Sequence, residues 1–199
     1  MRSFAVSLIL LFSSYSLLKA EPGNPGKLIA AAAKSQIGKT LHYDPAYVRL
    51  AYPGGDVPIE RGVCSDVVIR AFRQIEIDLQ VKVHEDMKRA FDRYPKVWGL
   101  SHPDKNIDHR RVLNLTTYFS RAGFSLPLSK DAAQYLPGDI VAWRLDNGLP
   151  HIGIVADQMN SKKTAYMVVH NIGAGTRLED VLFEYKIIGH FRYRPPKER

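Results

Sequence analysis

The sequence predicts an α+β protein in which helices pack on a mostly antiparallel sheet of about five strands. Apolar residues recur at helical spacing before residue 125. After Pro137-Gly138, short stretches rich in Val, Ile and aromatic residues follow one another. The two patterns do not alternate, which argues against the repeated strand–helix–strand units of a parallel sheet.

Four stretches have the spacing of amphipathic helices. The first ends on Gly38, a residue type that often follows the last helical turn. In the second, Val67, Ala71 and Phe72 share one face. Prolines and adjacent glycines predict a loop at 43–61, and turn-forming polar residues predict another at 95–110. The predicted helices are residues 27–38, 63–77, 83–94 and 111–122.

Five strands are predicted in the last third of the chain, separated by turn-forming sequences such as Asp146-Asn147-Gly148. Their order along the chain favours hairpin connections, in which the start of one strand lies beside the end of the next. The predicted strands are residues 139–145, 151–158, 165–170, 181–185 and 188–193.

The amino-acid composition limits the classes of protein to which the chain can belong. The chain has 199 residues, 45% of them hydrophobic and 24% charged, which fits one folded domain. Its single cysteine excludes an internal disulfide, a thiolate zinc site and an iron–sulfur cluster. No glycine motif that binds phosphate is present, so we expect no cofactor and no metal.

The first twenty residues predict a secretory signal peptide. Arg2 precedes an apolar run at 4–18, and a small residue, Ala20, precedes Glu21, where cleavage is expected. The run is shorter than the ~20 residues of a membrane-spanning helix. We therefore expect an exported bacterial protein, periplasmic or extracellular, with a single domain at 21–199 and no membrane span after cleavage. Loss of Arg2 and Lys19 lowers the net charge from +8 to +6, which suits an anionic partner other than nucleic acid.

The cysteine, Cys64, opens the second predicted helix. A thiol at a helix N-terminus meets unpaired backbone amides and the positive end of the helix dipole, so we expect a lowered pKa and a nucleophilic thiolate. A buried, inert cysteine is the alternative. Asp66, two residues later, is expected to cap the helix or to orient a partner.

A thiolate nucleophile requires a base, and two of the seven histidines lie at strand ends. His151 begins one predicted strand and His170 ends the next. Antiparallel pairing would bring them together, which permits a chain from Cys64 to His151 to His170, with the third residue fixing the imidazole. His109 and Arg110 are weaker candidates for binding a substrate carboxylate through the planar guanidinium.

These motifs resemble the NlpC-type cell-wall cysteine peptidases, a papain-like group. The shared features are Gly-Val-Cys-Ser-Asp at 62–66, Pro-Gly-Asp at 137–139 and His-Ile-Gly-Ile-Val at 151–155. Tyr52 lies in a Tyr-Pro-Gly-Gly segment similar to one whose tyrosine lies beside the nucleophile in that group. More specifically, the chain is similar to an exported bacterial family labelled domain of unknown function 1287, through blocks at 62–71, 83–87, 106–111 and 170–173.

The resemblance implies a papain-like NlpC-type fold and a cell-envelope amidase or endopeptidase that cuts peptidoglycan stem peptides. Cys64, His151 and His170 would be catalytic, with Tyr52, Asp66 and Asn171 in support. The chain departs from the group at Val63 and Asp66, and a helical insertion at about 80–125 separates Cys64 from His151. A thioesterase or acyltransferase on the same fold, or a non-catalytic envelope-binding module, is the alternative function.

Overall fold

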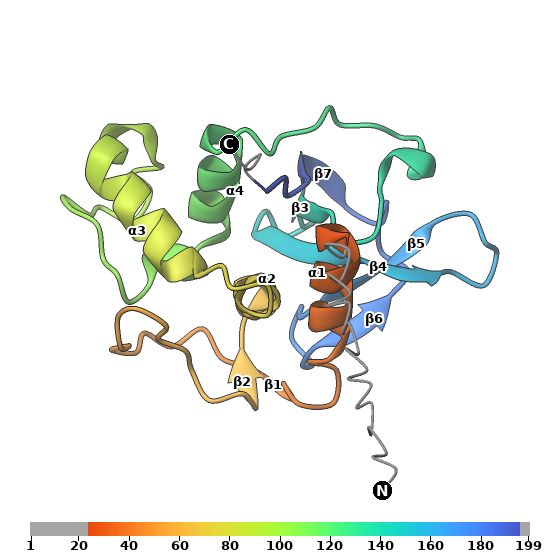
Figure 1. Ribbon diagram of the computed structural model, residues 1–199, viewed down its shortest axis with the longest axis horizontal. Coiled ribbons are helices and arrows are strands. Elements are labelled where there is room, and N and C mark those ends of the chain that lie inside the picture. Colours follow the sequence, from red (N-terminus) through yellow and green to blue (C-terminus); the bar gives the residue numbers. More distant parts are fainter. Residues whose placement is uncertain (1–23, 196–199) are drawn as a thin grey trace, which may run out of the picture.

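The computed structural model describes residues 24–195, in which helices cover one face of a five-stranded sheet (Figure 1). The predicted signal peptide lies outside the described residues. Among residues 24–195, no helix is both long enough and apolar enough to cross a membrane.

The sheet has the order β6-β5-β4-β3-β7, and every neighbouring pair is antiparallel. Its short connections are hairpins, except for the one that returns β7 to the edge beside β3. The predicted α+β class and the five antiparallel strands are therefore confirmed. The strands are β3 (Ile140–Arg144), β4 (Pro150–Met159), β5 (Tyr166–His170), β6 (Arg177–Glu179) and β7 (Lys186–Phe191).

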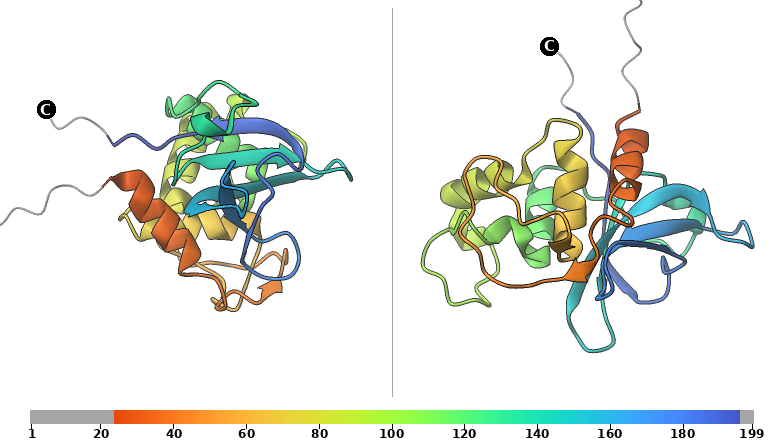
Figure 2. Two further views of the ribbon diagram at one scale, coloured as in Figure 1. Left: turned by 90° about the vertical axis from the view of Figure 1, so that its right-hand side faces the viewer. Right: turned by 90° about the horizontal axis from the view of Figure 1, so that it is seen from below.

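The helices fall into two groups. The helices α1 (Pro25–Lys34) and α2 (Cys64–Arg73) both pack on β4. The helices α3 (Leu79–Ala90) and α4 (Val112–Arg121) lie beyond α2, on the side away from β5 and β6 (Figures 1 and 2). Short 3₁₀ turns complete the helical structure: η1 (Phe91–Arg93), η2 (Asp108–Arg110) and η3 (Ala132–Gln134).

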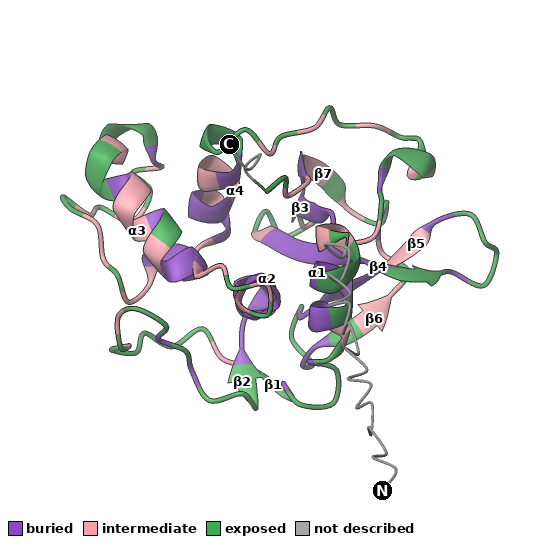
Figure 3. Cartoon of the chain, in the orientation of Figure 1, coloured by how far each residue is buried: buried purple, intermediate pink, exposed green. Residues whose placement is uncertain are grey.

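The main core lies between the helices and one face of the sheet. Ile152, Ile154 and Ala156 of β4 contribute to it, together with the buried face of α2. Figure 3 shows this burial along α2 and the central strands. The opposite face of the sheet carries a smaller core, which includes Trp143 and Val155. His151 and Gly153 alternate with Ile152 and Ile154, so they point to this second face.

One predicted strand is wrong. Residues 181–185 form turns, and the fifth strand is instead β6, which the sequence did not indicate. Leu182 is buried against the second face of the sheet, and its carbonyl accepts a 3.0 Å bond from the Trp143 indole. The apolar character of residues 181–185 therefore reflects a turn that covers the sheet. The strand β6 is short and largely polar, as edge strands often are.

The helix boundaries differ by a few residues for local reasons. Asp78 accepts a 2.9 Å bond from the Gln80 amide, so α3 begins at Leu79 rather than at residue 83. Two residues at each end of the predicted loop 43–61 form a small parallel ladder, in which β1 (His42–Tyr43) pairs with β2 (Arg61–Gly62). This ladder brings Tyr43 close to the start of α2.

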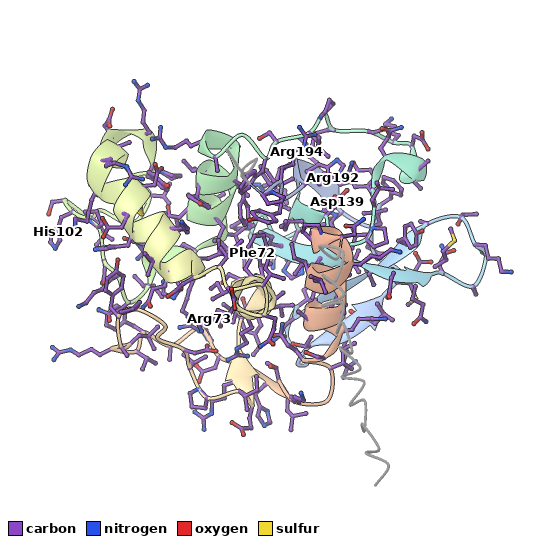
Figure 4. All side chains as sticks on the ribbon, viewed as in Figure 1. Phe72, Arg73, His102, Asp139, Arg192 and Arg194 are labelled. Atoms are coloured by element: carbon purple, nitrogen blue, oxygen red, sulfur yellow. The ribbon has the colours of Figure 1, made fainter. Side chains whose placement is uncertain are left out.

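A buried carboxylate holds the start of β3 against the end of β7. Asp139, from the Pro-Gly-Asp turn, accepts bonds from His190 Nε2 at 2.7 Å and from Arg192 Nε at 2.6 Å. Asp139 and Arg192 lie next to each other in Figure 4, where β3 begins and β7 ends. The Pro-Gly-Asp motif thus fixes β3 against β7 and does not reach the candidate site.

Gly153 allows β4 and β5 to approach where His170 lies. A Cβ atom at this position would lie 2.8 Å from Val168 Cγ1, 3.0 Å from His170 Cβ and 3.0 Å from Val169 O. The first contact is closer than Cβ atoms approach in proteins, and the other two, one of them with the backbone, are unusually tight. The missing side chain leaves the space in which His170 approaches His151.

We predict that Gly153→Ala lowers the free energy of unfolding by about 1–3 kcal/mol, because the added methyl group overpacks the β4–β5 contact. Urea unfolding measures the loss, and histidine NMR reports whether the two imidazoles have moved apart. An unchanged urea midpoint with unchanged histidine resonances would show that the strands do not need glycine here.

Candidate active site

Cys64 is the first residue of α2 and lies against the strand that carries His151. Val63 is the N-cap in an extended conformation, and its amide donates a 2.7 Å bond to Asp66 Oδ2. The thiol is only 3% exposed. The backbone amides of Ile152, Ser65 and Cys64 itself are directed at the sulfur. Because Ile152 follows His151, the sulfur lies beside the start of β4.

The pKa of this thiol is shifted in the direction opposite to the one expected from the sequence. Burial raises the pKa of Cys64 to about 12. The three backbone amides oppose this shift, and the negative charge of Asp66 adds to it. The helix N-terminus therefore does not produce a thiolate in this state of the protein, and Cys64 is a neutral thiol near pH 7.

His151 and His170 form a buried pair. His151 Nε2 lies 2.8 Å from His170 Nδ1, and the rings meet edge to face with an interplanar angle of 71°. Burial, with a smaller contribution from the charge of His170, lowers the pKa of His151 to about 3. His151 is therefore a neutral imidazole near pH 7, and the His170 contact leaves its Nδ1 as the free nitrogen.

The 19 positions between these histidines are explained by the length of β4. This strand has ten residues, and β5 returns along it after a turn. Its first residues therefore lie beside the last residue of β5.

A cleft of about 410 Å³ opens onto His151. Its walls include Tyr43, Ile172, Tyr185 and the turn between β3 and β4. Tyr43 also lies close to Cys64: burial, and then the charge of Cys64, raise the pKa of its phenol to about 12. Tyr43 thus presents a protonated hydroxyl in the region between the thiol and the cleft.

Tyr52, which the motif placed beside the nucleophile, lies elsewhere. Its hydroxyl donates to Glu85 at 3.1 Å, and its ring meets His84 edge to face. The following glycines are bound to the start of α3, because the Gly54 amide donates to Asp78 and the Gly55 amide donates to Gln80. The Tyr-Pro-Gly-Gly segment is a structural loop, and Tyr43 is the cleft tyrosine that lies close to Cys64.

Sequence reasoning missed Tyr43 because its position depends on a ladder only two residues long. Such a ladder has no apolar periodicity from which it could be predicted. The only signal available was the recurrence of tyrosine in the loop before Cys64.

Asp66 forms a buried ion pair with Arg110. The guanidinium donates from Nε and Nη2 to the two carboxylate oxygens, each at 2.9 Å. Its remaining bonds go to the carbonyls of Ala46 and Asp44. Both side chains are almost fully buried. Arg110 therefore joins the helical segment to the start of α2 and to the chain after Tyr43, and it does not line the cleft.

His109 is also unsuited to the substrate role that the sequence suggested. It is 2% exposed and does not line the cleft. Burial, followed by the charges of Arg73 and Arg110, lowers its pKa to about 4. His109 is a neutral group inside the helical part of the protein.

Asn171 connects the end of β5 to the residues before Cys64. Its Nδ2 donates to the Gly62 carbonyl at 3.0 Å, and its Oδ1 accepts from the Gly173 amide. Gly62 itself is close to Asp66, and a Cβ atom there would lie 3.1 Å from a carboxylate oxygen. Asn171 therefore fixes the segment that leads into Cys64 relative to His170.

The sequence also gave no indication of Glu179, which lies on β6 with one carboxylate oxygen 2.8 Å from His170 Nε2. Across residues 24–195, no group of three or more His, Cys, Asp or Glu side chains is placed to hold a metal ion.

Comparison with known proteins places the chain in a family. The profile of the family described as "Domain of unknown function (DUF1287)" matches residues 30–193. The chain belongs to this family. It is 56% identical over 196 residues to the "Uncharacterized protein YijF" of Escherichia coli (strain K12), covering 94% of this chain and 95% of that protein.

One solved structure, described as "Structure of NlpC1 from Trichomonas vaginalis", aligns with 90% of this chain at a TM-score of 0.48 and 17% identity. This chain covers 48% of that one.

We predict that Arg110→Met lowers the free energy of unfolding by about 3–5 kcal/mol, because it leaves the Asp66 carboxylate buried without its cation. Arg89→Met is the control, since the Arg89 side chain is exposed and lies 3.6 Å from Asp86, which keeps its bonds to Arg121 when Arg89 is lost; such a pair is worth about 0–1 kcal/mol. Urea unfolding compares the two. Equal losses would mean that the Asp66–Arg110 pair does not stabilise the start of α2.

We predict that iodoacetamide alkylates Cys64 at pH 7 at least about tenfold more slowly than free cysteine, whose pKa is about 8.5. Since the pKa of Cys64 is raised to about 12, the rate should still rise between pH 8 and pH 10 without a plateau. Mass spectrometry follows the reaction, and the urea-unfolded chain is the control. A plateau below pH 8 would contradict the raised pKa.

Proposed function

We propose that this protein is a cell-envelope cysteine hydrolase that cleaves an amide bond in peptidoglycan stem peptides. The observation that carries the proposal is the convergence of three groups at one place. The backbone amide of Ile152, the residue after His151 on β4, is directed at the Cys64 sulfur, His151 is hydrogen-bonded to His170, and a cleft opens onto His151.

The first step in this proposal is a proton transfer on substrate binding. Because Cys64 and His151 are both neutral at rest, the thiol gives its proton to His151 Nδ1 as the sulfur attacks the substrate carbonyl. A new C–S bond forms, and the carbonyl oxygen takes the negative charge. His151 is now an imidazolium, and its Nε2–H still donates a hydrogen bond to His170 Nδ1.

The oxyanion requires hydrogen-bond donors that are already in place. The backbone amides of Cys64 and Ser65 at the start of α2 lack intrahelical partners and are directed at the sulfur, so in this proposal they lie close to the oxyanion that forms there. The Tyr43 hydroxyl is the side-chain donor in this proposal, supported by its place in the cleft and by its raised pKa.

The intermediate then collapses in two stages. His151 protonates the leaving amine as the C–N bond breaks, and a thioester remains on Cys64. Water next attacks the thioester while His151 Nδ1 takes a proton from it. The acid product leaves and Cys64 recovers its proton, so the neutral thiol and the neutral imidazole are restored.

Features of the sequence support the proposed substrate and cellular location. The motifs around Cys64 and His151 resemble those of cell-wall peptidases, and residues 1–20 have the pattern of a signal peptide. The net charge of +6 after cleavage favours an anionic polymer of the envelope.

Two observations favour other functions on the same fold. An apolar cavity of about 630 Å³, lined by Leu128, Phe183 and Ile187, shares Tyr185 with the cleft. It would suit the acyl chain of a thioesterase or acyltransferase substrate. The burial of Cys64 would equally suit a non-catalytic binding module. Incubation with a panel of chromogenic esters and thioesters, alongside muropeptides, separates these functions.

We predict that Cys64→Ala abolishes cleavage of purified muropeptides and leaves the fold intact. We also predict that Tyr43→Phe lowers kcat by a factor of about 10²–10³, which is the effect of one lost oxyanion donor. Mass spectrometry of the fragments identifies the bond cut. Tyr52→Phe is the matched control, because its hydroxyl bonds to Glu85 on α3.

Cleavage by Cys64→Ala would rule out the mechanism. Loss of activity in Tyr52→Phe with full activity in Tyr43→Phe would reverse the roles of the two tyrosines.

A further inference from the structure

The bond between the two histidines can hold its proton in two ways. Either His151 Nε2–H donates to His170 Nδ1, or His170 Nδ1–H donates to His151 Nε2. In the second arrangement, Nε2 of a neutral His151 is the acceptor, so the single N–H proton of His151 is on Nδ1. That nitrogen then has no lone pair with which to accept the Cys64 proton. Only the first arrangement leaves His151 a base.

Glu179 lies where it can favour one of these two proton arrangements over the other. It is directly opposite Val168 across the β5–β6 ladder, and Val168 and His170 lie two residues apart on one face of β5. Its Oε2 atom is 2.8 Å from His170 Nε2. The His170 side chain is 1% exposed, whereas the Glu179 side chain is 38% exposed and remains in contact with water.

We propose that Glu179 is a positioning residue that fixes the tautomers of His170 and His151, a role that rests on the function proposed above. A carboxylate oxygen accepts hydrogen bonds and does not donate them, so His170 carries its proton on Nε2 toward Glu179. His170 Nδ1 is then an acceptor, His151 donates to it from Nε2, and His151 Nδ1 is left with its lone pair for the thiol.

The charges around this contact agree with the assignment. Burial lowers the pKa of His170, and the Glu179 carboxylate opposes that shift. His170 is therefore a neutral ring beside an anion. The oxygen lies off the straight line of an Nε2–H bond, so the contact is bent and largely electrostatic. The other charged or titratable groups nearby are Tyr185 and Arg177, and Arg177 Nε donates to the Ala174 carbonyl.

The test measures tautomers directly and does not depend on activity. Long-range ¹H–¹⁵N spectra of the mature protein at pH 7 show which ring nitrogens are protonated. We compare wild type with Glu179→Met, which keeps the length of the side chain and removes the acceptor. Glu184→Met is the control: Glu184 is an exposed glutamate, and its loss changes the net charge equally.

In wild type, we expect protons on Nε2 of both histidines. In Glu179→Met, a population of His170 with its proton on Nδ1 should appear. The kcat for muropeptides should then fall about tenfold, less than the ~10²–10⁴ that a general base contributes. Glu184→Met should change neither the tautomers nor kcat.

A His170 Nδ1–H in wild type, or identical tautomers in wild type and Glu179→Met, would overturn the assignment of Glu179. A wild-type protein that has the expected tautomers but cleaves no muropeptide would instead overturn the proposed hydrolase function.

Discussion

The buried pair of Asp66 and Arg110 is the interaction on which the geometry of the site depends. Asp66 caps the amide of Val63, directly before the cysteine, and Arg110 holds that carboxylate with two bonds. The same guanidinium binds the carbonyls of Asp44 and Ala46, next to Tyr43. One cation thus fixes the segment before Cys64 and the segment that carries Tyr43, from the helical part of the protein. This helical part, which the sequence predicted as an insertion at about 80–125, supports the site through the bonds of Arg110.

The strands supply the second half of the site through close backbone approach. Gly153 lets β5 lie near β4 where His170 is placed, and Asn171 connects the end of β5 to Gly62. The histidine pair and the start of α2 are therefore positioned by the same few residues after β5. Proton transfer between two groups depends on their relative position, and the bond from Asn171 fixes the end of β5, where His170 lies, relative to the segment before Cys64.

The sequence predicted the class of fold, the order of its elements and the two strand-end histidines, because periodicity and turn residues are local signals. It could not place Tyr43, whose position depends on a two-residue ladder, or Glu179, which lies on a short polar edge strand. It also predicted a lowered pKa for Cys64 from the helix N-terminus alone. The desolvation that reverses this shift arises from long-range packing against β4, which no local pattern shows.

The neutral state of Cys64 has a consequence for the chemical stability of the sulfur. Peroxides and disulfides react with thiolates and hardly at all with thiols. With a pKa of about 12, only about one molecule in 10⁵ carries the thiolate at pH 7. A lone sulfur held in this way is protected against sulfenic acid formation and mixed disulfides, which no second cysteine of this chain could reverse.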